Sequence, residues 1–229
     1  MKAFARLLVD LLHAPSTRAK TALMKAYFAA TPDPARGIAL EGLTGGLDIK
    51  AAKASLFREL AAARVDPVLF ELSYDFVGDL AETVALIWPS AETPAEPPAL
   101  PDLVAALRGA SRAEMPAVVG GLLDRLDGDG RWALLKLVLG GTRVGVSERL
   151  AKTALAELGG KDVAEIEEIW PGLAPPYREL FAWLDGRGAR PSVDAAATFR
   201  PMMLAQPLDP AEFGTMDPAD WRAEWKWDG

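Results

Sequence analysis

The chain has 229 residues, of which 50% are hydrophobic and 25% charged, with a formal net charge of −7. It contains no cysteine, which excludes disulfides, thiolate metal sites and cysteine nucleophiles and fits a cytoplasmic protein. The length suits one large domain or two smaller ones. The apolar N-terminus is interrupted by Arg6 and Asp10, and no stretch approaches the roughly 20 apolar residues of a membrane span. We therefore expect neither a signal peptide nor a membrane partner.

The basic residues are unevenly distributed along this acidic chain. Residues 14–64 carry eight basic and four acidic side chains, and residues 128–152 carry five and two. Two modestly basic zones in an acidic protein are compatible with a polyanionic partner, but they are equally compatible with ordinary solvated helix faces. Charge alone does not decide between these two interpretations.

Apolar residues recur at helical spacing through most of the first 188 residues, which predicts a mainly α fold. The N-terminal stripe begins at Phe4, and Ser16 or Thr17 is placed to cap a second helix. Further helices are predicted at Gly37–Leu43, Ile49–Val65, Asp102–Arg108, Ser111–Leu126, Val163–Ile169 and Pro176–Leu184.

Turn-forming residues separate these helices. Asp79 and Glu82 have the spacing of a capping box in front of the apolar run 84–88. Pro89–Pro101 holds five prolines in thirteen residues, so we expect an exposed loop or linker there. Asp127 and Asp129 lie in a glycine-containing turn that does not complete a calcium-loop pattern, and we predict no metal site.

The stretch after the apolar run 132–139 is rich in glycine. It contains Gly140, Gly141, Thr142, Arg143, Gly145 and Ser147. The glycines let the backbone approach another molecule, and a serine cap points the amides of the next helix towards it. Together with an arginine, these groups would make a phosphate site. A plain helix–loop–helix corner is the alternative interpretation.

The last six residues, 224–229, read Glu-Trp-Lys-Trp-Asp-Gly. In a strand, Glu224, Lys226 and Asp228 would share one face and the two tryptophans the other. A lysine amine between two carboxylates is suited to covalent catalysis once it loses its proton, and Gly229 permits a sharp exit from the strand. A polar edge strand with no catalytic role is the alternative.

The hexapeptide resembles the Lys-x-Asp-Gly nucleotide-binding motif of ATP-dependent DNA ligases. The resemblance implies that Lys226 attacks the α-phosphate of ATP and carries AMP as a phosphoramidate. It also implies that Glu224 faces the adenine and that Asp228 and Gly229 line the nucleotide pocket. Residues 199–205 resemble the strand that leads into the adenylation domain of this family.

Two upstream stretches resemble the DNA-binding domain of the same family. One is Gly78-Asp79-Leu80 followed by an apolar helix. The other is the glycine-rich stretch, which is similar to a Leu-x-x-Gly-x-x-Arg-x-Gly corner that grips the duplex backbone across the minor groove. Gly140, Arg143 and Gly145 match this pattern, whereas Gly141 and Thr142 stand where some family members carry a basic residue.

From this resemblance we expect residues 1–188 to form an all-helical DNA-binding domain. Residues 189–229 would be a linker and the first strands of an α+β nucleotidyltransferase domain. The parent enzyme would seal nicked duplex DNA in repair, replication or recombination, with ATP and Mg²⁺ as cofactors. The remaining adenylation motifs and the OB-fold domain lie outside this sequence, so we expect the 229 residues alone to be inactive.

Two alternatives remain at this stage. An all-helical interaction or scaffold module would account for the acidic, alanine-rich helices without any catalytic role. Capping enzymes and RNA ligases share the lysine motif, but they do not usually carry a long helical N-terminal region.

Overall fold

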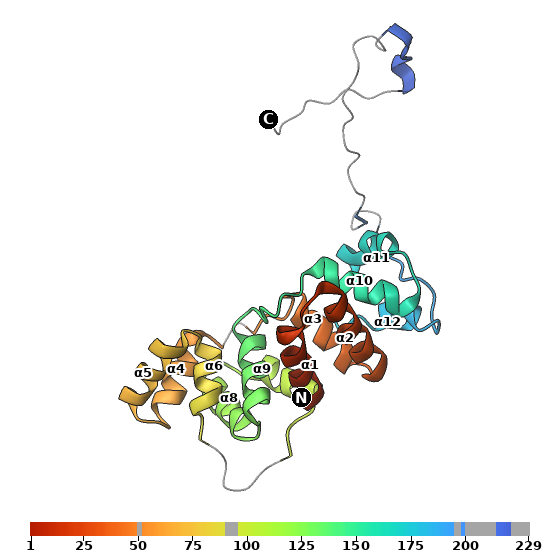
Figure 1. Cartoon of the computed structure of the whole chain (residues 1–229). Helices are drawn as coiled ribbons and strands as arrows, with labels where there is room; N and C mark the ends of the chain where they lie inside the picture. The colour runs from red at the N-terminus through yellow and green to blue at the C-terminus, as the bar shows by residue number, and fades with distance from the viewer. Residues whose placement is uncertain (50–51, 90–95, 195–197, 200–213, 221–229) are drawn as a thin grey trace. The chain divides into compact units, whose positions relative to one another are not determined.

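The computed structural model describes residues 1–49, 52–89, 96–194, 198–199 and 214–220 (Figure 1). All regular secondary structure in these ranges is helical, which confirms the mainly α prediction. The predicted strands at 199–205 and 224–229 lie, apart from Phe199, outside the described residues. The chain divides into two units, Met1–Phe199 and Arg200–Gly229. In the second unit, the described residues include a 3₁₀ turn at Pro218–Asp220.

The described part of the first unit contains twelve α-helices. They are α1 (Lys2–His13), α2 (Thr17–Ala30), α3 (Ala35–Leu43), α4 (Ala54–Ala62), α5 (Pro67–Val77), α6 (Leu80–Ile87), α7 (Leu100–Gly109), α8 (Met115–Asp124), α9 (Gly128–Val138), α10 (Glu148–Gly159), α11 (Val163–Ile169) and α12 (Arg178–Leu184), with a 3₁₀ turn at Trp170–Gly172.

The ends of these helices follow local rules. Helix α11 has the predicted bounds and begins with a capping box between Asp162 and Glu165. Asp79 caps α6 by accepting a hydrogen bond from the amide of Glu82 at 3.0 Å. Helix α8 begins later than predicted, at Met115, because a proline at its second position fits only the first turn of a helix.

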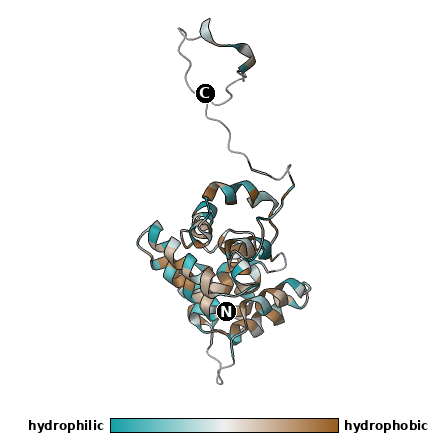
Figure 2. Ribbon diagram, turned by 90° about the vertical axis from the view of Figure 1, so that its right-hand side faces the viewer, coloured by the Kyte–Doolittle hydropathy of each residue, from teal (hydrophilic) through white to brown (hydrophobic). Residues whose placement is uncertain are grey.

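The helices of the first unit pack in a series. Helix α5 packs on α6, α6 on α9, α9 on α1, α1 on α2, and α2 on α10, which also contacts α11 and α12. Figure 1 shows α4, α5, α6 and α8 at one end of this unit and α10, α11 and α12 at the other. Figure 2 shows hydrophobic and hydrophilic residues along the same helices, as amphipathic packing requires.

Helix α3 is buried along its length, from Arg36 to Leu43. A Cβ atom at Gly37 would collide with the backbone carbonyl of Pro176, so only glycine permits this close approach. The helix therefore forms a central element against which the segment before α12 packs.

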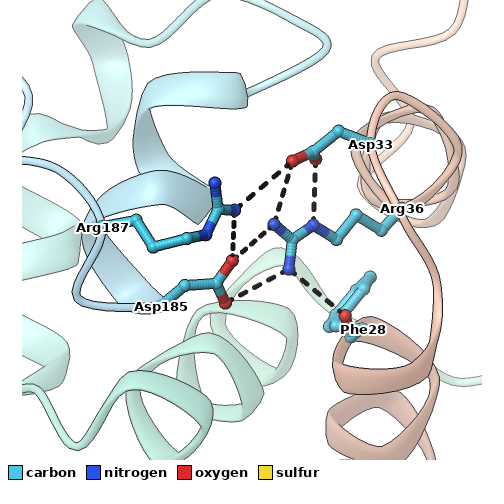
Figure 3. Close-up of polar contacts among 5 residues, drawn as sticks. All are labelled: Phe28, Asp33, Arg36, Asp185 and Arg187. Atoms are coloured by element: carbon cyan, nitrogen blue, oxygen red, sulfur yellow. Dashed lines mark hydrogen bonds and ion pairs between the residues drawn. The ribbon is translucent and has the colours of Figure 1, made fainter.

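A cluster of charges ties α3 to the chain after α12 (Figure 3). Arg36 binds both oxygens of Asp33 at 2.9 and 3.0 Å, and both oxygens of Asp185 at 3.3 and 2.7 Å. It also donates to the carbonyl of Phe28 at 3.5 Å. Arg187 donates to Asp185 at 2.6 Å on the other side of the cluster. Residues 149 positions apart in sequence are thus joined through one guanidinium group.

The surroundings of Arg36 favour its charged form. Only 6% of its side chain is exposed, and its guanidinium lies 4.3 Å from the centre of the Phe181 ring. Hydrogen bonding to Asp33 raises the pKa of Arg36, against the opposing effect of burial. Hydrogen bonding to Arg36 lowers the pKa of Asp185, again against the effect of burial.

We expect Arg36→Met to lower the free energy of unfolding by about 3 kcal/mol, because the partly buried Asp33 and Asp185 lose the guanidinium that joins them and Asp185 keeps, among the described residues, only Arg187. Urea unfolding at pH 7 measures this loss. Arg6→Met is the matched control, because Arg6 pairs with Asp10 on the surface. Loss of this surface pair should lower the free energy of unfolding by less than about 1 kcal/mol. If both variants lose the same free energy of unfolding, the cluster around Arg36 stabilises the fold no more than a surface ion pair does.

The lowered pKa of Asp185 also predicts a pH dependence. A carboxyl whose folded-state pKa is below its unfolded value of about 3.9 stabilises the fold above that pH and loses the effect as the pH falls further. Asp185→Asn should therefore cost about 1–2 kcal/mol at pH 7 and clearly less at pH 3. Urea unfolding at both pH values tests this, and an unchanged difference would refute the linkage.

Candidate nucleic-acid interface

The glycine-rich stretch forms the loop between α9 and α10, and it has an unusual backbone. Gly140, Arg143 and Gly145 all have positive φ angles, of 80°, 45° and 69°. For the two glycines this conformation carries no steric penalty, but for Arg143 it does. Strained residues of this kind tend to occur at functional sites, and the Arg143 side chain is exposed.

The loop leaves a run of backbone amides without protein partners. The amide of Gly141 donates to the carbonyl of Lys136 at 3.3 Å, but no amide from Thr142 to Arg149 donates to another described residue. The next amide, of Leu150, donates to the side chain of Ser147 at 3.2 Å, which caps α10. Adjacent free amides at a helix N-terminus form a binding site for anions.

Lys20 of α2 holds the loop in place. Its Nζ donates to the carbonyl of Val144 at 2.6 Å and lies 3.4 Å from the carbonyl of Gly145. A Cβ atom at Gly145 would displace this Nζ, and the positive φ of 69° there independently favours glycine. The neighbouring Val144 side chain is buried and anchors the loop. Lys20 thus binds loop carbonyls while the loop amides remain without partners among the described residues.

Helices α2 and α10 run in parallel with their N-termini together. Thr17 and Ser147, at the two starts, line one surface depression of about 580 Å³. Two turns further along, Lys25 lies 4.0 Å from Glu157. Both helices therefore present their positive dipole ends at the same place, and the exposed Arg149 lines the same depression.

The Gly-Asp-Leu stretch lies beside this loop. Lys136 of α9 donates to Asp79 at 2.7 Å, and a small cleft of about 160 Å³ is lined by residues from both segments, including Leu80, Gly140 and Arg143. The loop therefore runs from the N-terminus of α6 to the N-termini of α2 and α10.

The Asp79–Lys136 pair also neutralises a charge next to the loop. Burial raises the pKa of the Asp79 carboxyl, but hydrogen bonds from Lys136 and from the Glu82 amide outweigh it, and the pKa is lowered. The carboxylate is thus held by a lysine and a backbone amide. Glu148, the acidic residue in the first turn of α10, is likewise paired with Lys152 at 2.6 Å.

The structure groups the residues proposed for DNA binding in one loop, and it adds two lysines that sequence reasoning missed. Lys136 could have been noticed as the lone charge within the apolar run 132–139, which requires a partner. Lys20 carries no such signal, because its partner lies 124 positions away. Four proposed nucleotide-site residues, Glu224, Lys226, Asp228 and Gly229, lie outside the described residues.

A scan against models of protein families finds no match to this chain, and a search of curated protein sequences finds no relative. In the described ranges, no helix is both long and apolar enough to span a lipid bilayer. Nor do three or more Asp, Glu or His side chains of the described residues group as a metal site.

Because Arg143 has a positive φ, we expect glycine to be the residue that fits its backbone conformation with least strain. Arg143→Gly should be roughly 0.5–1 kcal/mol more stable than Arg143→Ala, because alanine keeps the steric penalty and glycine removes it. Thermal or urea unfolding of the two variants measures the difference. If alanine is equally stable, the loop does not adopt this conformation in solution.

Proposed function

We propose that this chain binds nicked duplex DNA and supplies the nucleophilic lysine of an ATP-dependent DNA ligase. The observation that carries the proposal is the loop between α9 and α10. It combines unpartnered amides from Thr142 to Arg149, the exposed Arg143 and the clustered N-termini of α2 and α10. Exposed amides, a guanidinium and a helix N-terminus are all groups that attract a phosphate.

The composition of the loop supports contact with the DNA backbone and not with base edges. Glycines, valines and backbone amides carry no pattern of donors and acceptors that distinguishes one base pair from another. An enzyme that seals nicks must act regardless of sequence. Arg143 adds a charge, and Lys20 fixes the shape of the loop.

The covalent chemistry falls to Lys226, which remains a proposal from the sequence motif. Its neutral Nζ would attack the α-phosphorus of ATP, forming a phosphoramidate and releasing pyrophosphate. The AMP would then pass to the 5′-phosphate at the nick. Attack by the 3′-hydroxyl would form the phosphodiester and release AMP. Glu224, Asp228 and Gly229 would line the nucleotide pocket, with ATP and Mg²⁺ supplied to the complete enzyme.

Binding to a fluorescent nicked duplex over a salt series tests this proposal. The affinity should fall steeply with salt, because contacts to phosphates release counterions. Arg143→Ala and Arg143→Gly should both weaken binding by roughly fivefold to tenfold and reduce the slope of log K against log salt by about one.

Two variants serve as controls for the loss of a positive charge. Arg112→Ala removes an exposed arginine outside the loop, and Lys226→Ala removes a lysine whose proposed role is covalent. Both should bind nicked duplex as the unmodified chain does. An absence of binding at low salt, or equal losses in all variants, would overturn the DNA-binding proposal and favour an interaction or scaffold module.

A further inference from the structure

Helix α5 exposes an apolar face. Seven large hydrophobic side chains of the described residues are exposed, and four of them belong to this one helix. These four, here called the α5 stripe, are Val68, Leu69, Leu72 and Phe76, with exposed fractions of 65%, 53%, 63% and 93%.

The α5 stripe points away from the body of the unit. At 100° per residue its four members fall within about 100° of the helix circumference. The opposite side carries Phe70, which is buried, and Tyr74, whose ring stacks on Phe70 at 6.4 Å and lies under Arg58 at 4.3 Å. One side of α5 is thus used for packing on α4 and α6, and the other lacks a partner in the described chain.

The surroundings of the stripe are acidic. Residues 66–88 contain five carboxylates and no lysine, arginine or histidine. Glu71 and Asp75 are exposed on α5 and follow one edge of the stripe, one turn apart. The nearby Arg58 lies over the Tyr74 ring on the packed side, and among the described residues no ion pair joins it to Glu71 or Asp75.

We propose that the α5 stripe docks a basic amphipathic helix of a partner protein. The stripe has the width of one helix face and the spacing i, i+4, i+8, which matches the anchor spacing of a second helix packed along it. The acidic edge complements lysines or arginines flanking the apolar residues of that helix.

The same charges argue against other occupants. A second copy of this chain, docked through its own stripe, would place Glu71 and Asp75 against carboxylates of the same kind. Nucleic acid and anionic lipid surfaces would be repelled in the same way. The proposal is independent of DNA binding, which the loop between α9 and α10 would perform.

Fluorescence anisotropy with two synthetic peptides tests the proposal on the full chain. The probe is a helical peptide of about five turns with leucines on one face and lysines on the other, and its counterpart carries glutamates in place of lysines. We expect saturable binding of the lysine peptide with a Kd at or below about 100 μM and no binding of the glutamate peptide.

Three variants assign the binding to the stripe. Leu72→Gln combined with Phe76→Ser should lower the affinity for the lysine peptide by about tenfold or more. Leu12→Gln, which changes an exposed apolar residue of α1, should leave the affinity for the lysine peptide unchanged. Glu71→Lys with Asp75→Lys should reverse the preference in favour of the glutamate peptide.

The remaining outcomes overturn the proposal. These are no binding of the lysine peptide, binding that the stripe variants do not change, or self-association of the unmodified chain that the Leu72→Gln/Phe76→Ser variant abolishes. Nicked-duplex affinity should be the same in the stripe variants, so a failure here is distinguishable from a failure of the DNA-binding proposal.

Discussion

The candidate interface depends on the charge cluster around Arg36. The anion site proposed for the loop between α9 and α10 requires α2 and α10 to lie in parallel with their starts together. Helix α10 is packed against α2 on one side and α12 on another, and Arg36 joins the turn after α2, through Asp33, to the end of α12, through Asp185. A contact beyond the C-terminus of α2 therefore supports the arrangement of the helices that begin at the loop.

Several other polar contacts in the interior have the same role of fixing which helices meet. Arg131 donates to the carbonyls of Leu123 and Trp88 at 2.9 and 3.1 Å, and Arg108 reaches the buried Glu41 of α3. Apolar burial favours many alternative arrangements of alanine- and leucine-rich helices, because it is not directional. A buried charge tolerates only the arrangement in which its partner is present, so these pairs distinguish the native packing from its competitors.

The mainly α character and most helix positions could be predicted because they depend on local sequence. Asp79 and Asp162 are caps recognisable from a few residues, and Val163–Ile169 was predicted to the residue. The late start of α8 follows from Pro116. Ser111 and Glu114, which lie inside the predicted helix, instead form reciprocal hydrogen bonds in a turn before it. The pairings that shape the site, Lys20 with the Val144 carbonyl and Lys136 with Asp79, join residues 124 and 57 positions apart, and one sequence holds no local signal for them.

The distribution of charge gives the chain two surfaces with opposite preferences. The N-termini of α2 and α10, with Arg143 and Arg149, favour an anionic partner, whereas Glu71 and Asp75 beside the α5 stripe disfavour one. A net charge of −7 would by itself argue against a nucleic-acid partner, but a phosphate near the loop responds mainly to charges within a screening length of roughly 8–10 Å. The same screening means that a basic helix on the α5 stripe would respond mainly to the carboxylates around it. Two partners of opposite charge can thus be selected by one acidic protein, each by its local field and not by the total charge.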